Sequence, residues 1–181
     1  MLLLAYCLFN FAFDGNNSIS GVFVTRKFNA QPGQLSLLLV LIGVATAVVQ
    51  AALVERAMKR FGEKRMTVVS LLSQAIGGVL IFVAPALWLV YPISFAQSAL
   101  SGFIFSSLGT LIAGKVSERE QGTLAGVSAA LAGLMSAMGP LFAGLMYDRV
   151  LPGASYLTGA AVLLVAIVLI QGVISDKGSK Q

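Results

Sequence analysis

The stretch Glu55–Arg65, which reads Glu-Arg-Ala-Met-Lys-Arg-Phe-Gly-Glu-Lys-Arg, decides the fold of this chain. It is the longest charged run in the sequence and holds five of the twelve Lys and Arg residues. Long apolar segments end and begin on either side of it. Basic charge concentrated in this way between two membrane spans is an orientation signal that marks the cytoplasmic side.

The composition places the chain in lipid rather than in water. Of its 181 residues, 57% are hydrophobic and only 10% are charged, and the mean hydropathy is +0.90. Soluble globular domains carry roughly 25% charged residues. The net charge of +5 does not indicate a nucleic-acid partner. The basic residues stand in short stretches between apolar segments, where they are expected to face anionic lipid headgroups.

Six segments are long and apolar enough to cross a bilayer, at roughly 17–25 residues per span. Each is expected to be an α-helix, because inside lipid the backbone polar groups need internal partners. The first segment lacks the basic start of a signal peptide, so we expect a span there. The sequence predicts an all-α membrane protein with a single six-helix domain over residues 1–181, and its spans are Leu2–Val24, Leu35–Val54, Met66–Ala84, Leu87–Ala113, Gly122–Tyr147 and Tyr156–Ile174.

The distribution of basic residues predicts the orientation of these spans. Nine lie at the termini and in the connections on one side of the predicted membrane, and three lie on the other. The positive-inside rule therefore predicts cytoplasmic termini, and aromatic residues at the opposite boundary are expected to form an interfacial belt. The nine are Arg56, Lys59, Arg60, Lys64, Arg65, Lys115, Arg119, Lys177 and Lys180, the three are Arg26, Lys27 and Arg149, and the aromatic residues are Trp88, Tyr91, Tyr147 and Tyr156.

Polar side chains concentrate in the first and fourth predicted helices. Asn10, Asp14 and Asn17 share one face of the first helix, and Gln97 and Ser101 would face them from the fourth. A carboxylate in mid-span is costly unless it meets a wet cavity or a partner, and acids at this depth mark functional sites by default. We interpret Asp14 as a proton-coupling residue and the other four as substrate contacts.

A second interpretation of Asp14 remains open. Asp14-Gly-Asn-Asn is also a turn signal. The acid would then cap a break in the first helix, and asparagine side chains would satisfy the freed backbone groups. The two interpretations are compatible, because broken helices often build transport sites.

The fifth predicted helix carries a ladder of small residues that includes Gly126 and Gly133. Such rows allow a second helix to approach closely, either from another chain or from within this one. The pair Gly139-Pro140 belongs to the same packing surface and is expected to kink the helix, because proline removes a backbone donor. The third and sixth helices carry few polar groups and are expected to face lipid.

The residue types exclude several kinds of chemistry. The sequence contains no histidine, which removes the usual general base and the commonest metal ligand. Cys7 is the only cysteine and is expected to be a small buried hydrophobe. Since no catalytic constellation is visible, we predict no enzymatic activity, no catalytic residue, no metal and no cofactor.

Two stretches resemble motifs of the major facilitator superfamily. Arg60-Phe-Gly-Glu-Lys-Arg65, with Gly62 and Lys64 inside it, is similar to the inner-loop motif Asp-Arg-x-Gly-Arg-Arg in its degenerate second-half form. Val116–Gly126, running on to Gly139-Pro140, is similar to the start of that family's eleventh helix. The aspartate of the family motif aligns with Lys59, so its salt-bridge role is not carried over.

From Leu2 to Ile174 the chain resembles the carboxy-terminal six-helix half of such a transporter, closest to the tetracycline-resistance-type drug–proton antiporters. The resemblance implies a 3+3 inverted repeat and proton-coupled efflux of a small organic molecule. It also implies that the first and fourth helices line the substrate cavity, while the second and fifth form the seam between halves.

The expected partners are a small-molecule substrate, protons, the lipid bilayer and a second six-helix half or a second copy, with no nucleic acid. The expected location is the bacterial plasma membrane. The alternative is a non-transporting membrane component, either a truncated transporter remnant or a docking subunit.

Overall fold

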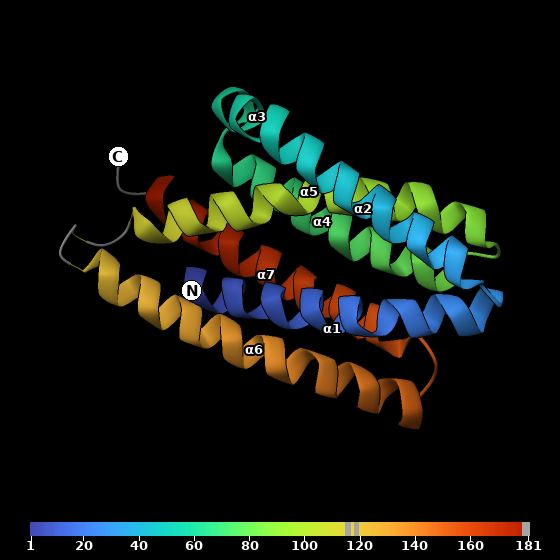
Figure 1. The fold of residues 1–181 in the computed structure, drawn as a ribbon. Coiled ribbons are helices and arrows are strands. Elements are labelled where there is room, and N and C mark those ends of the chain that lie inside the picture. The colour runs from blue at the N-terminus through green and yellow to red at the C-terminus, as the bar shows by residue number, and fades with distance from the viewer. Residues whose placement is uncertain (115–116, 118–119, 179–181) are drawn as a thin grey trace.

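The computed structural model describes all residues except 115–116, 118–119 and 179–181, and the described part is a bundle of helices (Figure 1). Three of the basic residues on the predicted cytoplasmic side, Lys115, Arg119 and Lys180, lie outside the described residues, as does part of the stretch 116–126. The helices are α1 (Leu2–Phe28), α2 (Pro32–Ala52), α3 (Val54–Phe61), α4 (Glu63–Val83), α5 (Leu87–Ala113), α6 (Gln121–Arg149) and α7 (Ala154–Gly178).

The charged stretch after α2 is mostly helical. α3 carries the charges, and α4 begins directly after Gly62. Val54 is buried, whereas Lys59 and Arg60 are exposed, so α3 is amphipathic. Lys59 Nζ lies 2.6 Å from Glu55 Oε1, one turn away, and this hydrogen bond lowers the pKa of the Glu55 carboxyl. Charge density does not oppose helix formation here, because Glu55 and Lys59 are opposite charges spaced by four residues.

The first helix has no break at Asp14–Asn17. α1 is continuous from Leu2 to Phe28 and ends at Asn29, whose backbone is left-handed with φ 50°. The hydroxyls of Ser18 and Ser20 donate to carbonyl oxygens within the same helix. The turn interpretation of Asp14 is therefore wrong. Packing on both sides of α1 and local hydrogen bonds outweigh the turn preference of the Gly-Asn-Asn sequence.

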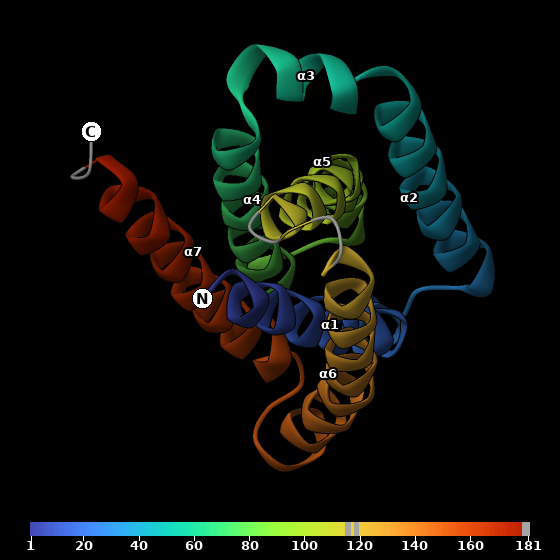
Figure 2. The same ribbon diagram turned by 90° about the vertical axis from the view of Figure 1, so that its left-hand side faces the viewer.

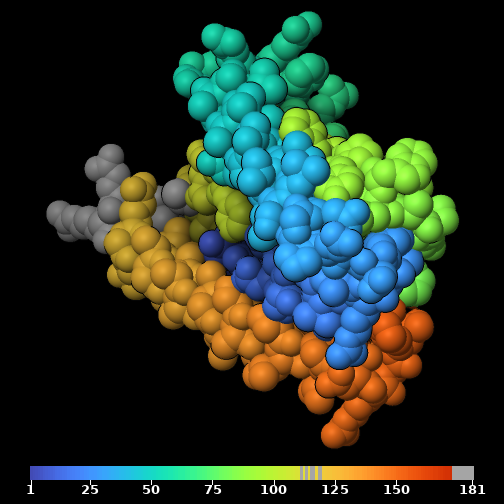
Figure 3. Space-filling view, turned by 45° about the vertical axis from the view of Figure 1, so that its right-hand side comes forward, coloured from blue at the N-terminus to red at the C-terminus, as the bar shows by residue number. Residues whose placement is uncertain are grey.

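The long helices form a curved layer in which neighbours pack in the order α2, α5, α4, α7, α1, α6 (Figure 2). α2 and α6 are the two ends of this order, so each packs mainly on one neighbour. Only 17% of the apolar window of α2 and 11% of that of α6 are buried, against 44% for α4 and 50% for α7. Figure 3 shows α1 on the face between α2 and α6.

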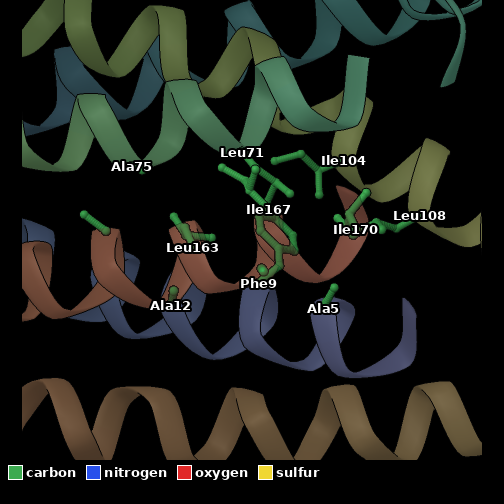
Figure 4. Close-up of a cluster of buried hydrophobic side chains, with 12 residues drawn as sticks. Ala5, Phe9, Ala12, Leu71, Ala75, Ile104, Leu108, Leu163, Ile167 and Ile170 are labelled. Atoms are coloured by element: carbon green, nitrogen blue, oxygen red, sulfur yellow. The ribbon is translucent and has the colours of Figure 1, made fainter. Parts of the chain in front are cut away.

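The main core lies where α1, α4, α5 and α7 meet (Figure 4). Phe9, Leu71 and Ile104 are fully enclosed there, and Leu163 and Ile167 approach them from α7. α7 thus buries one face in the core and exposes the opposite face, which includes Leu164, Val165 and Val168. The prediction that this helix faces lipid therefore describes only one of its sides.

A second core near the other end of the bundle contains two tyrosines that were assigned to the interfacial belt. Tyr147 is 7% exposed and Tyr156 is 3% exposed, whereas Trp88 is 67% exposed. The belt interpretation is wrong for Tyr147 and Tyr156, because the second core encloses them between helices.

Five of the described helices are long and apolar enough to cross a membrane, by length and composition. They are α2, α4, α5, α6 and α7. α1 is as long as α5 but is less apolar, because Asn10, Asp14 and Asn17 interrupt it. The start of α1, α3 and the start of α6 lie at one end of the bundle, and the connections α1–α2, α4–α5 and α6–α7 lie at the other (Figure 1).

Candidate functional site

A cavity of about 210 Å³ lies among α1, α2, α4, α5 and α7. Among the described residues that line it, none is charged. Its polar lining consists of amide and hydroxyl side chains, which present hydrogen-bond donors and acceptors without net charge. These residues are Asn16, Asn17, Ser20, Thr46, Gln50, Gln74, Ser94, Gln97, Ser98 and Ser101.

Three of these amide side chains lie directly against a glycine of a neighbouring helix. A Cβ at Gly77 would lie 2.5 Å from Gln97 Cδ, a Cβ at Gly102 would lie 2.9 Å from Gln50 Cγ, and a Cβ at Gly159 would lie 2.7 Å from Asn16 Nδ2. Larger residues at these glycines would displace the amides, since real Cβ atoms essentially never come so close. The glycines therefore help to position the polar groups of the cavity wall.

Gln74 and Gln97 form a reciprocal pair between α4 and α5. Gln74 Nε2 donates to the Gln97 carbonyl oxygen at 2.9 Å, and Gln97 Nε2 donates to the Gln74 carbonyl oxygen at 3.1 Å. Each amide satisfies a backbone acceptor of the facing helix, as buried polar groups in a membrane span require. Gln97 Nε2 also donates to Gln74 Oε1 at 3.4 Å, so the two side chains contact each other as well.

Three phenylalanine rings contribute to the apolar part of the cavity wall. The Phe9 ring meets the Phe105 ring edge to face, with centroids 5.2 Å apart, and Phe13 packs on both. Phe9 is enclosed in the main core, so Phe13 and Phe105 are the rings that can offer a flat apolar body a stacking surface. The cavity thus combines aromatic rings with neutral amide and hydroxyl groups.

Asp14 lies at a different place, between α1 and α6. Ser136 Oγ donates a hydrogen bond to Asp14 Oδ2. One residue further, Gly15 packs against Gly139: a Cβ at Gly139 would lie 2.5 Å from the Phe11 carbonyl oxygen and 3.0 Å from the Gly15 backbone nitrogen. The two glycines bring the helix backbones close enough for a short serine side chain to reach the acid.

The structure brings together Asn17, Gln97 and Ser101 but separates them from Asn10 and Asp14. Asn10 is 6% exposed, and its Nδ2 donates to the Tyr6 carbonyl oxygen at 2.8 Å within α1. Asn17 is exposed and lines the cavity. The face that these residues share on α1 therefore divides between the cavity and the contact with α6.

The predicted packing residues of α6 have different surroundings. Gly139 is buried against α1, whereas a Cβ at Gly126 or Gly133 would meet nothing within 4 Å. Pro140 lies inside α6, which stays helical through it.

The inner-loop motif lies at the junction of α3 and α4. Gly62 has φ 80°, a left-handed conformation that favours glycine and lets one helix follow the other without a linker. The Arg60 guanidinium carbon lies 5.5 Å from the centroid of the Phe61 ring, and Lys64 and Arg65 are exposed.

Sequence reasoning did not select several residues of the cavity: Asn16, Gln50, Gln74, Ser94, Ser98 and Tyr156. The hydroxyl of Tyr156 is buried and has no hydrogen-bond partner among the described residues. The available signal was an uncharged amide inside an apolar span, as at Gln50 and Gln74. Each lies within its helix, and an amide inside a membrane span needs a partner or a cavity.

Comparison with known proteins identifies the family. The sequence matches the Major Facilitator Superfamily over residues 2–180. The chain belongs to the major facilitator superfamily. It is 30% identical over 149 residues to the tetracycline resistance protein, class C, of Escherichia coli, covering 81% of this chain and 37% of that protein. It is 26% identical over 162 residues to the quinolone resistance protein NorA of Staphylococcus aureus, covering 89% of this chain and 42% of that protein.

The fold agrees with this family. The human organic anion transporter MFSD10 (TETRAN) superposes with a TM-score of 0.85 at 25% sequence identity, covering 93% of this chain and 39% of that structure. The chain therefore spans about two-fifths of the length of the superfamily relatives that it matches. Superfamily members of this kind are transporters rather than enzymes, and this member is an integral membrane protein.

Proposed function

We propose that the chain is the carboxy-terminal six-helix half of a secondary transporter that exports a small organic molecule in exchange for protons. The observation that carries this proposal is the cavity among α1, α2, α4, α5 and α7, with its uncharged polar wall and aromatic base. A neutral wall of this kind favours a substrate that carries its polarity in hydroxyl, carbonyl or amide groups around an apolar ring. The names of the bacterial relatives, tetracycline and quinolone resistance proteins, support this substrate class.

Proton coupling is assigned to Asp14. Within the described residues the only ion pair within 4 Å joins Lys59 to Glu55, so Asp14 has no basic partner there. An acid inside a membrane span marks a functional site by default, because it needs a wet cavity or a partner there. Because Asp14 faces α6 and not the cavity, protonation would act on substrate through the contact between α1 and α6. A transport cycle needs two conformations of the protein that differ in their affinity for the proton, because a proton shifts a conformational equilibrium only through such a difference.

The partner is a second six-helix unit, either another half of the same transporter or a second copy. The support is the low burial of α2 and α6. These helices stand at the two ends of the layer and lie on either side of α1 (Figure 3). The open surroundings of Gly126 and Gly133 on α6 also suit close approach by a facing helix.

We propose six membrane spans, with α1 included, and both termini in the cytoplasm of a bacterial cell. The support is the alternation of helix ends in Figure 1 and the excess of basic residues around α3. A cysteine placed at Lys59 is expected to react with a membrane-impermeant thiol reagent only from the inside, and one placed at Gln31 only from the outside. Both are exposed, and the native Cys7 is buried, so background labelling is low. Labelling of both positions from one side would contradict this topology.

The transport proposal is tested in inside-out membrane vesicles with tetracycline and with a quinolone as substrates. Addition of substrate to energised vesicles is expected to release protons from the lumen, reported by a fluorescent pH dye. Replacement of Asn17 by leucine removes one exposed amide from the cavity and is expected to raise KM by up to about tenfold, the value of one neutral hydrogen bond.

The matched control is Gln171→Leu, which removes an exposed amide from α7 outside the cavity lining and is expected to leave KM unchanged. Absence of substrate-dependent proton release with every compound tried would favour the alternative, a non-transporting membrane component.

A further inference from the structure

A second cavity, of about 420 Å³, lies at the end of the bundle opposite α3. It is lined by Phe23, Arg26 and Lys27 of α1, Phe82 of α4, Tyr147 of α6 and Pro152 of the connection to α7. None of these residues lines the first cavity, so the two are separate.

Both basic side chains of this cavity are held over aromatic rings. The Arg26 guanidinium carbon lies 5.5 Å from the Tyr147 ring centroid. Lys27 Nζ lies 5.2 Å from the Phe23 ring centroid and 5.9 Å from that of Phe82. These cation–π contacts hold the charges at fixed positions and shield part of each from water.

The connection between α6 and α7 holds the aromatic wall in place. Gly153 has φ 88°, and a Cβ there would lie 2.5 Å from Phe23 Cε2 and 2.9 Å from Phe82 Cδ2. The backbone at this glycine therefore packs directly on two rings of the cavity and limits their movement.

Among the residues that the structure describes, no acid pairs with the basic side chains of this cavity. Lys27 Nζ donates to the backbone carbonyl oxygen of Phe82 and, at 3.5 Å, to that of Ile81. These bonds offset the negative end of the α4 dipole. They use two of the three ammonium hydrogens of Lys27 and leave the third without a partner in the described part of the chain. Asp148, the acid beside Tyr147, forms no ion pair with Arg26 within 4 Å, and in the described residues no side-chain or backbone acceptor takes the Arg26 donors. The Arg26 guanidinium and the Lys27 ammonium therefore lie against aromatic rings of the same cavity, and both keep hydrogen-bond donors without a partner among the described residues.

We propose that this second cavity binds an anionic group, a phosphate or a carboxylate, carried on an apolar body. The anion would lie between Arg26 and Lys27, and the apolar body would lie on Phe82, Tyr147 and Pro152. Charge-assisted hydrogen bonds from a guanidinium are among the stronger polar contacts available to a protein. A phospholipid at the membrane boundary or a dissolved aromatic anion would both supply this chemistry.

The test is isothermal titration calorimetry on the purified protein in an uncharged detergent. Three probes separate the parts of the proposal: phenyl phosphate, short-chain phosphatidylglycerol, and inorganic phosphate, which has no apolar body. We expect saturable binding of phenyl phosphate, phosphatidylglycerol or both at one site per chain, and much weaker binding of inorganic phosphate.

The decisive variant is Arg26→Gln, because Lys27 also holds the end of α4 and its loss would disturb the fold. Arg26→Gln is expected to weaken binding by about tenfold or more, as loss of a charged hydrogen bond does. Arg149→Gln, at the same end of the bundle but outside the cavity lining, is the matched control and should bind as the parent does. Thermal labelling of the buried Cys7 checks that each variant is folded.

The outcomes are distinct. Binding of phenyl phosphate alone identifies a dissolved anion, and binding of phosphatidylglycerol alone identifies a lipid; both support the site. Equal weakening by Arg26→Gln and Arg149→Gln would show diffuse charge attraction and overturn it. Absence of saturable binding of either organic probe would overturn it as well. Inorganic phosphate bound as tightly as phenyl phosphate would overturn the requirement for an apolar body.

Discussion

Replacement of Gly139 by alanine is expected to lower the thermal stability of the protein by several degrees. A Cβ at this position would lie 2.5 Å from the carbonyl oxygen of Phe11, a backbone atom that cannot rotate away as a side chain does. The two helices α1 and α6 would have to separate, and overpacking of this kind costs about 1–3 kcal/mol. For a chain of this size each kcal/mol corresponds to about 2–4 °C in Tm.

The single cysteine of the chain provides the measurement. Cys7 is buried on α1, so a thiol-reactive fluorescent dye reports the temperature at which the helix becomes accessible. Gly133→Ala is the matched control on the same helix, because a Cβ there would meet nothing within 4 Å. Equal Tm values for the two variants would show that α1 and α6 do not pack as closely as described.

Replacement of Asp14 by asparagine is expected to abolish proton-driven transport while leaving substrate exchange intact. Asparagine keeps the size of the side chain and still accepts the hydrogen bond from Ser136, but it cannot take up or release a proton. Flux driven by a proton gradient should fall to the level of empty liposomes. Counterflow of labelled against unlabelled substrate, which needs no net proton movement, should continue because the cavity lining is unchanged.

The control for Asp14 is Asp148→Asn, which removes an exposed acid at the end of α6 and is expected to leave both fluxes unchanged. Asp14→Glu retains a carboxyl group and should recover part of the driven flux. Driven transport by Asp14→Asn at the parental rate would falsify the coupling role and leave Asp14 as a structural contact between α1 and α6.

The positions of the long helices followed closely from the distribution of apolar residues. The segment Leu87–Ala113 was predicted with the bounds that α5 has, and the other predicted spans fall inside or near the observed helices. This success has a simple cause. The backbone of an apolar stretch of this length has few alternatives to a helix, whatever its neighbours are.

The errors arose where local preference competed with packing. Asp14-Gly-Asn-Asn has the composition of a turn, yet α1 continues through it because it packs between α6 and α7. Tyr156 is an aromatic residue at the boundary of a predicted span, as belt residues are, yet the packing of α7 on α1 and α4 encloses it.

The sequence alone determined that the chain is helical, that it belongs in a membrane and that its polar side chains gather in the first and fourth spans, because these properties depend on composition and on spacing along one helix. Only the tertiary structure decided what each face meets. Gly126, Gly133 and Gly139 look alike in the sequence, but only Gly139 touches another backbone. Asp14 and Asn17 are three residues apart on α1, yet one meets Ser136 of α6 and the other lines the cavity. Helical spacing specifies the direction of a side chain from its own axis, and only the packing of the neighbouring helices specifies what lies in that direction.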